Sequence, residues 1–418
     1  MTICNRGVPG CVAVVRSRAT LACALVLGIA CTRELPLKEH VERLVQKGDY
    51  AQALALLDGA EKDQRPDWSL QELRVSVLLK AGQPDEALRV YVRRWQLGGP
   101  ESPELLRDLA VETLKHAIDS DDGLLRSRAA TALAGWHAPD LIPVIRVGLK
   151  LPDPSVRALA TEALGGIPGE ESAALLLQSL RDTDGAVRAA AAKAMHGNRD
   201  PAVLERLRSF MADSSPVVRL RAAAALAEAG DQTAFFTLLR FLNDRTESIR
   251  MQATECLGRV GRTDAIPALR PLLRDPSPYV RAYAGETLAR LHDPSGRPAL
   301  VWALRHPNRT AALYAAEALS NLGDPAGLEV LHAVLASPND PYAQLYAIWT
   351  LARLGDNGGI TILERVAVQP DAQLRAQAAW TFGEMGEADG LSDLKRLATD
   401  PVLAVRWQAV WALARRLG

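Results

Sequence analysis

The sequence predicts an all-α protein, a right-handed α-solenoid of about ten stacked helix pairs of 31 residues each, preceded by a short helical segment. Three observations predict it: a short element recurs at a constant spacing, the same small residue follows it in every copy, and a second apolar run lies between copies. At 418 residues the chain is also too long for one compact core, so a repeat or multi-domain architecture is expected.

The recurring element is an apolar residue followed by Arg and then by small residues. We call the place of this Arg the register position, and Ala312 and Gln344 occupy it in two of the ten copies. Successive register positions are 31 residues apart, except for one step of 32 before Gln344. A constant period of this length is typical of repeat proteins. The eight arginines at the register position are Arg126, Arg157, Arg188, Arg219, Arg250, Arg281, Arg375 and Arg406.

Each copy has the pattern of a helix with one narrow buried face. The third residue after the register position is always Ala, from Ala129 to Ala409, and the seventh is Leu, Met or Phe, from Leu133 to Leu413. At 100° per residue these positions lie, with the apolar residue before the register position, within one third of the helix circumference. The small residue would let a neighbouring helix come close.

A second apolar run between copies, such as 265–273, predicts a second helix in each repeat. Gly261, Gly323, Gly355 and Gly386 stand where a left-handed residue would end the preceding helix, and Pro near the following start suits a first helical turn. Each repeat is therefore expected to be helix, turn, helix. One such pair cannot bury its own apolar face, so it must stack on the next.

The consensus Asp-Pro-x-x-Val-Arg-x-x-Ala-x-x-Ala-Leu-Gly is nearly complete in residues 153–166 and 275–288. It resembles the HEAT-like repeats first described in phycobilisome lyases, and the resemblance covers about residues 119–418. It implies that the second helix of each pair lines a concave face, and that the acidic residue before the Arg ties neighbouring repeats together. It says little about function, because the family is mostly a binding scaffold. The residues six before their register Arg are Asp182, Asp213, Asp244, Asp275 and Asp400.

The segment 31–118 is also expected to be helical, with a different period. The pattern from Gly48 to Ala53 recurs from Gly82 to Ala87, 34 residues later, which resembles two tetratricopeptide units. A plain helical cap for the solenoid is the alternative. The predicted domains are thus a signal peptide at 1–30, a tetratricopeptide-like domain at 31–118 and the solenoid at 119–418.

The first thirty residues have the pattern of a targeting segment. Arg6, Arg16 and Arg18 precede an uncharged run of twelve residues, 19–30, which is shorter than the ~20 residues that a spanning helix needs. The run ends Leu-Gly-Ile-Ala-Cys at Cys31, which resembles the lipobox of bacterial lipoproteins and implies a lipidated Cys31 in the cell envelope, facing the periplasm or the outside. An unmodified Cys31 near an ordinary cleavage site is the alternative, and translation starting after Met1 would shorten the charged region.

Composition and residue spacing argue against several other functions. Basic and acidic residues number 49 each, so nothing in the net charge favours nucleic acid as a partner. The seven His residues show no spacing typical of metal ligands, and the chain lacks the His-Glu pairs with which the HEAT-like deoxyhypusine hydroxylases hold iron. We therefore expect no catalytic residue, no cofactor and no metal. Beyond Cys31 only Cys256 remains, where other repeats have Ala, and we expect it to be buried without a disulfide.

Candidate partner-binding residues lie two and five places after the register position, away from the buried face. They are Tyr283, Tyr314 and Tyr346 in the first of these columns and Trp349, Trp380 and Trp411 in the second, together with Trp407. For the Trp column, burial against an inward-curling superhelix or a second copy is the alternative. Glu255 and Glu286 share the second column in earlier repeats, where helical ion pairs with Arg259 and Arg290 explain them.

These observations favour a membrane-tethered, non-catalytic scaffold or adaptor that binds a protein or peptide on its concave face. The alternative is an envelope enzyme subunit, or a protein whose aromatic columns bind a small ligand or glycan. A glycan-cleaving site would need two carboxylates facing each other about 5 to 10 Å apart. Glutamates on consecutive stacked helices instead point the same way, which favours the scaffold.

If Cys31 carries the lipid, the substitution Cys31→Ser should move the mature protein from the membrane to the soluble fraction, because it removes the group to which the acyl chains are attached. Fractionation of the two proteins at high salt measures this. A Cys31→Ser protein that stays with the membrane at high salt would disprove the anchor.

Overall fold

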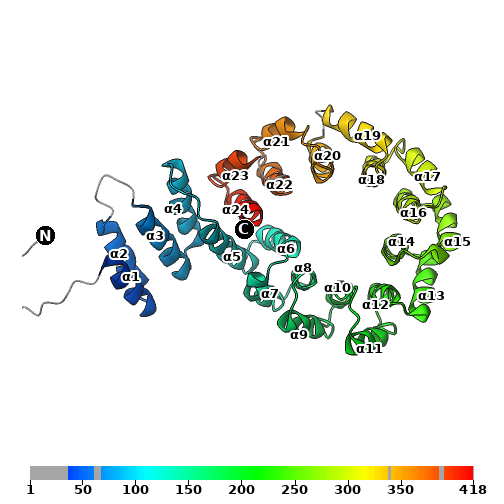
Figure 1. The fold of residues 1–418 in the computed structure, drawn as a ribbon, viewed down its shortest axis with the longest axis horizontal. Helices are drawn as coiled ribbons and strands as arrows, with labels where there is room; N and C mark the ends of the chain where they lie inside the picture. The colour runs from blue at the N-terminus through cyan, green and yellow to red at the C-terminus, as the bar shows by residue number, and fades with distance from the viewer. Residues whose placement is uncertain (1–35, 61–66, 338–339, 386–389, 418) are drawn as a thin grey trace, which may run out of the picture. The chain divides into compact units, whose positions relative to one another are not determined.

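The computed structural model of the chain describes residues 36–60, 67–337, 340–385 and 390–417, and all regular structure in these ranges is helical (Figure 1). The chain divides into two compact units, 1–64 and 65–418. The first unit contains α1 (Leu37–Gln46) and α2 (Tyr50–Ala60). The helices α3 (Trp68–Lys80) and α4 (Pro84–Gln96), which resemble the second tetratricopeptide unit in sequence, belong to the same compact unit as the repeats.

In the second unit, from α5 onward, the helices alternate between an outer and an inner row (Figure 1). Each register position lies in a helix of the inner row, so the predicted helix pairs are confirmed. Four short 3₁₀ segments (Pro139–Leu141, Phe241–Asn243, Thr263–Ala265 and Arg270–Arg274) extend the shorter outer helices. The outer helices are α5 (Pro103–Ile118), α7 (Ile142–Gly148), α9 (Glu170–Ser179), α11 (Pro201–Phe210), α13 (Gln232–Arg240), α15 (Ile266–Leu269), α17 (Gly296–Ala303), α19 (Pro325–Leu335), α21 (Ile360–Val366) and α23 (Leu391–Leu397). The inner helices are α6 (Gly123–Gly135), α8 (Pro154–Leu164), α10 (Gly185–Ala194), α12 (Pro216–Glu228), α14 (Glu247–Val260), α16 (Pro278–Arg290), α18 (Arg309–Asn321), α20 (Pro341–Arg353), α22 (Ala372–Gly383) and α24 (Leu403–Leu417).

The core follows the predicted stripe along every inner helix. The ten alanines three residues after the register position, from Ala129 to Ala409, are 0% exposed, and the residues seven after it are buried as well. Because the alanine side chain is a single methyl group, successive inner helices such as α8 and α10 can pack closely against each other. Gly261, Gly323 and Gly355 have the left-handed φ predicted for helix ends, whereas Gly386 lies outside the described residues.

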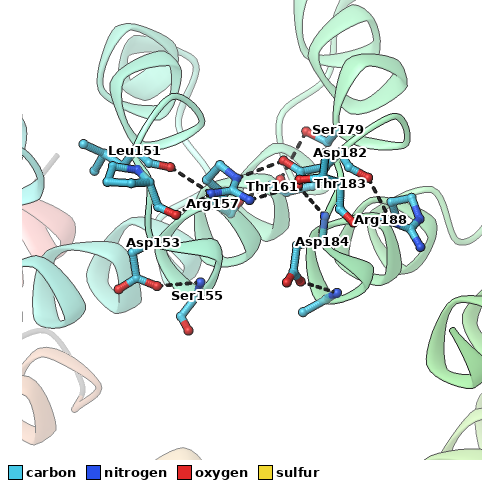
Figure 2. Close-up of polar contacts among 12 residues, drawn as sticks. Leu151, Asp153, Ser155, Arg157, Thr161, Ser179, Asp182, Thr183, Asp184 and Arg188 are labelled. Atoms are coloured by element: carbon cyan, nitrogen blue, oxygen red, sulfur yellow. Dashed lines mark hydrogen bonds and ion pairs between the residues drawn. The ribbon is translucent and has the colours of Figure 1, made fainter.

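A ladder of arginine–aspartate pairs joins consecutive repeats, and Figure 2 shows the pair of Arg157 and Asp182. Nε and Nη2 of Arg157 donate to the two carboxylate oxygens of Asp182 at 2.9 and 3.0 Å. Nη1 of the same arginine donates to the carbonyl of Leu151, in the turn before its own helix, at 2.9 Å. Each register Arg of this kind therefore fixes its own turn and the next repeat at once.

The ladder recurs along the chain with the same geometry. Arg188 pairs with Asp213, Arg250 with Asp275 and Arg375 with Asp400, in each case through two oxygens and across 25 residues. The hydrogen bonds from arginine lower the pKa of Asp182 and Asp213, so both carboxylates are held in the charged form. The expected structural role is confirmed for Asp182, Asp213, Asp275 and Asp400.

The end of the repeat array packs on its beginning, because α24 contacts α5 and α6 (Figure 1). We call this contact the seam. Arg406, the last register Arg in this sequence, donates to Oδ1 of Asp85 in α4 at 2.8 and 3.1 Å. Nε1 of Trp411 donates to the hydroxyl of Thr113 in α5 at 3.0 Å. The seam thus repeats the kinds of contact that neighbouring repeats make.

The seam corrects the expectation for two candidate residues. Trp411 is only 2% exposed and Trp407 5%, so neither lies on an open face. For Trp411 the alternative, burial against an inward-curling superhelix, describes the structure. Trp411 does lie away from the alanine stripe on the helical wheel. The pattern within one repeat does not show that α5, far away in the sequence, covers this part of α24.

Replacing Trp411 by Ala should lower the free energy of unfolding by about 3 to 5 kcal/mol, because it removes a packed indole and leaves Thr113 without its donor. Urea unfolding followed by circular dichroism measures the change. Trp302, which is 58% exposed on α17, is the matched control, and Trp302→Ala should cost less than about 1 kcal/mol. Equal effects of the two substitutions would contradict the seam.

Candidate partner-binding surface

Five aromatic side chains lie along the inner helices of the later repeats, as a stacked pair and a group of three. Tyr283 on α16 stacks on Tyr314 of α18, with ring centroids 4.2 Å apart and planes 17° apart. Trp349 on α20 lies 5.7 Å from Tyr346 of the same helix and 5.8 Å from Trp380 of α22, between ring centroids. All five are half-buried. We call Tyr283, Tyr314, Tyr346, Trp349 and Trp380 the aromatic arc.

The repeat geometry explains why these rings meet. Residues two and five after the register position lie on one face of a helix, three positions apart, so Tyr346 and Trp349 are neighbours on α20. The same positions recur in adjacent stacked helices, and rings of this size bridge the distance between neighbouring helix axes. The structure therefore brings five of the seven sequence-predicted residues together and places Trp407 and Trp411 at the seam.

Two glutamates hold the tyrosines from the preceding helix. The hydroxyl of Tyr314 donates to Glu286 of α16, and the hydroxyl of Tyr346 donates to Glu317 of α18. Arg353 of α20 lies 3.4 Å from Glu317 between Nη1 and Oε1, and its guanidinium lies 4.7 Å from the ring centroid of Trp349. The arc therefore combines aromatic faces with carboxylates whose positions are fixed by hydrogen bonds.

The electrostatics of the arc favour positive charge. Burial raises the pKa of Tyr283, and the nearby carboxylates of Glu255, Glu286 and Glu317 raise it further. Burial also raises the pKa of Tyr314, with Glu286 as the next cause. The pKa of Glu317 is raised mainly by burial, against the lowering effects of Tyr346 and Arg353. Each shift that the carboxylates cause reflects a negative potential at the rings.

One of the two expected helical ion pairs is confirmed and the other is wrong. Arg290 lies 3.7 Å from Glu286 on the same helix. Arg259 instead lies 3.6 Å from Glu228 of α12. Glu255 lies 4.0 Å from Arg221 of α12. Charged residues of the adjacent helix compete with those one turn away for the same ion-pair partner. The pattern of a single helix does not show which residues the adjacent helix supplies.

Cys256 is buried without a disulfide, as predicted. Arg221 and Arg259 donate to its sulfur at 3.3 and 3.4 Å. Burial raises the pKa of the thiol, against the lowering effect of the two arginines, so the group is uncharged at neutral pH.

A separate hollow of about 320 Å³ lies at the earlier repeats, between α6, α8 and α10. Lys193 and Glu162 form an ion pair of 3.0 Å at its wall. Gly166 also lines this hollow, and a Cβ at this position would lie 2.1 Å from His137.

In the part of the chain that the structure describes, no group of three or more His, Cys, Asp or Glu side chains is placed to hold a metal ion. Within the same residues, no helix has the length and apolar character needed to cross a membrane.

Sequence reasoning found the rings and missed how the carboxylates are used. The sequence pattern pairs Glu286 only with Arg290 on its own helix, whereas Glu286 and Glu317 each accept a hydrogen bond from a Tyr in the following repeat. The sequence contains a signal for these hydrogen bonds, since Glu precedes Tyr by 28 residues in one repeat and by 29 in the next. This spacing indicates a contact only when the two neighbouring inner helices are considered together.

The family model described as "HEAT repeats" matches residues 110–196, 201–276, 266–352 and 360–417 of the chain. No curated protein matches the chain.

Three solved structures resemble the chain at low sequence identity. The complex of CpcE and CpcF of phycocyanin lyase from Nostoc sp. PCC7120 is 21% identical, over 69% of this chain and 95% of that chain, with a TM-score of 0.34. Human deoxyhypusine hydroxylase with glycerol is 24% identical over 61% and 98%, with a TM-score of 0.30. YibA of Escherichia coli is 21% identical over 60% and 97%, with a TM-score of 0.34.

Proposed function

This chain belongs to the HEAT-repeat proteins, and we propose that it is a non-catalytic scaffold that binds a protein or peptide partner on its aromatic arc. The observation that carries the proposal is the arc itself, five half-buried rings on adjacent inner helices. Aromatic residues are enriched where proteins bind each other, and they supply most of the affinity at such sites.

The repeat itself does not require these rings. Five residues after the register position, where Trp349 and Trp380 stand, earlier repeats have Thr131, Lys193 and Ala224. The neighbouring inner helices pack through the invariant alanines in every case. A large aromatic side chain at this position therefore serves something other than the stacking of repeats, and a bound partner supplies the reason.

The carboxylates of the arc support a binding role over a catalytic one. Glu286 and Glu317 each accept a hydrogen bond from a tyrosine of the next helix, and each has an arginine near it. They come from equivalent positions of adjacent repeats, so they lie side by side and do not face each other across a cleft. A pair of carboxylates that acts on a glycosidic bond must flank that bond.

We further propose that the scaffold is tethered to a membrane of the bacterial envelope through a lipid on Cys31. Cys31 lies outside the described residues, and the support is the lipobox-like sequence that ends at this residue. A tether would keep the repeats at the membrane surface, where a scaffold meets membrane-associated partners at a raised local concentration.

Replacing Trp380 by Ala should weaken partner binding by about 2 kcal/mol or more, because hot spots concentrate in aromatic anchors. Its effect on the thermal midpoint should be smaller than that of Trp411→Ala, since Trp380 is only half-buried. Capture of partners from solubilised envelope, followed by titration of the captured protein, measures binding. Trp302→Ala, outside the arc, is the control and should bind normally. A Trp380→Ala protein that melts early but binds normally when folded would disprove the proposal.

A further inference from the structure

A cation of the chain itself, the guanidinium of Arg353, already lies against the arc. The guanidinium of Arg353 lies 4.7 Å from the ring centroid of Trp349 and 3.4 Å from Glu317, which also accepts from Tyr346. A guanidinium gains from an aromatic face and from a carboxylate at the same time, because it is planar and weakly hydrated. The Arg353 side chain is 47% exposed, so this site is open to solvent on one side.

A similar arrangement recurs one repeat earlier with two differences. Glu286 accepts from Tyr314 there, as Glu317 accepts from Tyr346. Arg353 stands nine residues after its register position, and the residue nine after the preceding register position is Asn321, which is exposed. The earlier site thus has the carboxylate, the tyrosine and the stacked ring of Tyr283, with Asn321 in place of Arg353 and Glu317 in place of Trp349.

One cation nearby already pairs with Glu286, and two others are engaged elsewhere. Arg290 forms an ion pair of 3.7 Å with Glu286, which is longer than the 3.4 Å between Arg353 and Glu317, and its side chain is half exposed. Arg221 hydrogen-bonds Gln252 and the sulfur of Cys256, and Arg259 lies against Glu228. Glu255, Glu286 and Glu317 together raise the pKa of Tyr283, which places a negative potential at its ring.

We propose that the partner is a peptide segment with a basic side chain, which binds against the Tyr283–Tyr314 stack and pairs with Glu286. This inference rests on the proposed function and names the chemistry of its partner. Arginine fits best, since Arg353 combines a carboxylate and an aromatic face within the chain, at Glu317 and Trp349. The arc also includes Trp349 and Trp380 in the next two repeats, so residues flanking the basic side chain would pack on these indoles.

Selection from a phage library of random dodecapeptides on the purified full chain tests both proposals separately. Peptides retained by the wild-type chain and lost on Trp380→Ala define the arc-dependent class. We expect this class to be enriched in Arg or Lys relative to the unselected library. The absence of any arc-dependent peptide would contradict the proposed function, whereas an arc-dependent class without basic enrichment would contradict only this inference.

The substitution Asn321→Arg supplies the missing guanidinium from the chain itself. It should compete with the basic residue of a selected peptide and weaken binding by about fivefold or more, as loss of one cation–π contact with its carboxylate does. Asn321→Gln keeps an uncharged amide and is the matched control, with affinity expected within about twofold of wild type. Fluorescence anisotropy with a labelled selected peptide gives both values, and thermal unfolding confirms that both variants fold. Equal affinity of the Arg and Gln variants would overturn the assignment of the basic residue to Glu286 and the tyrosine stack.

Discussion

The contact between successive inner helices is the constraint on which the rest of the structure depends. A single repeat has one apolar stripe and cannot cover it alone, so each stripe is buried by the next repeat. The alanine in the stripe sets how closely two helices approach, and the arginine–aspartate ladder fixes their relative position at the turn. An array built in this way leaves an unsatisfied contact at each end. In this chain the seam joins those ends, and Asp85 receives Arg406 where an aspartate of a following repeat would otherwise stand.

The placement of the arc follows from the same constraint. Because every inner helix presents its stripe to a neighbour, the residues two and five after the register position face the other way, and large rings there meet across helices. The repeats with Trp in this column are the last three, and closure at the seam buries the third of them. Trp349 and Trp380 therefore belong to a binding surface while Trp411 belongs to the core, although the three occupy equivalent positions in their repeats.

Sequence reasoning predicted what one repeat determines and failed where two distant parts of the chain meet. The period, the buried alanines, the helix ends at Gly261, Gly323 and Gly355 and the role of Asp182 all follow from a pattern within about 31 residues, and each is confirmed. The seam joins Trp411 to Thr113, nearly 300 residues apart, and no periodic pattern marks it. The partner of Arg259 was misassigned for a related reason, since Glu228 lies on the adjacent helix and competes with the residue one turn away.

The closed arrangement of the second unit is the central claim, and a distance across the seam tests it most directly. Gln96 and Thr399 are exposed residues that line the same hollow at the seam, of about 350 Å³. Spin labels on Gln96→Cys and Thr399→Cys, measured by pulsed electron resonance against the two single variants, should give one narrow peak at short distance, and Trp411→Ala should broaden it. A broad distribution at long distances in the otherwise unaltered protein would show that the ends of the array are apart, and the account of the seam would be wrong.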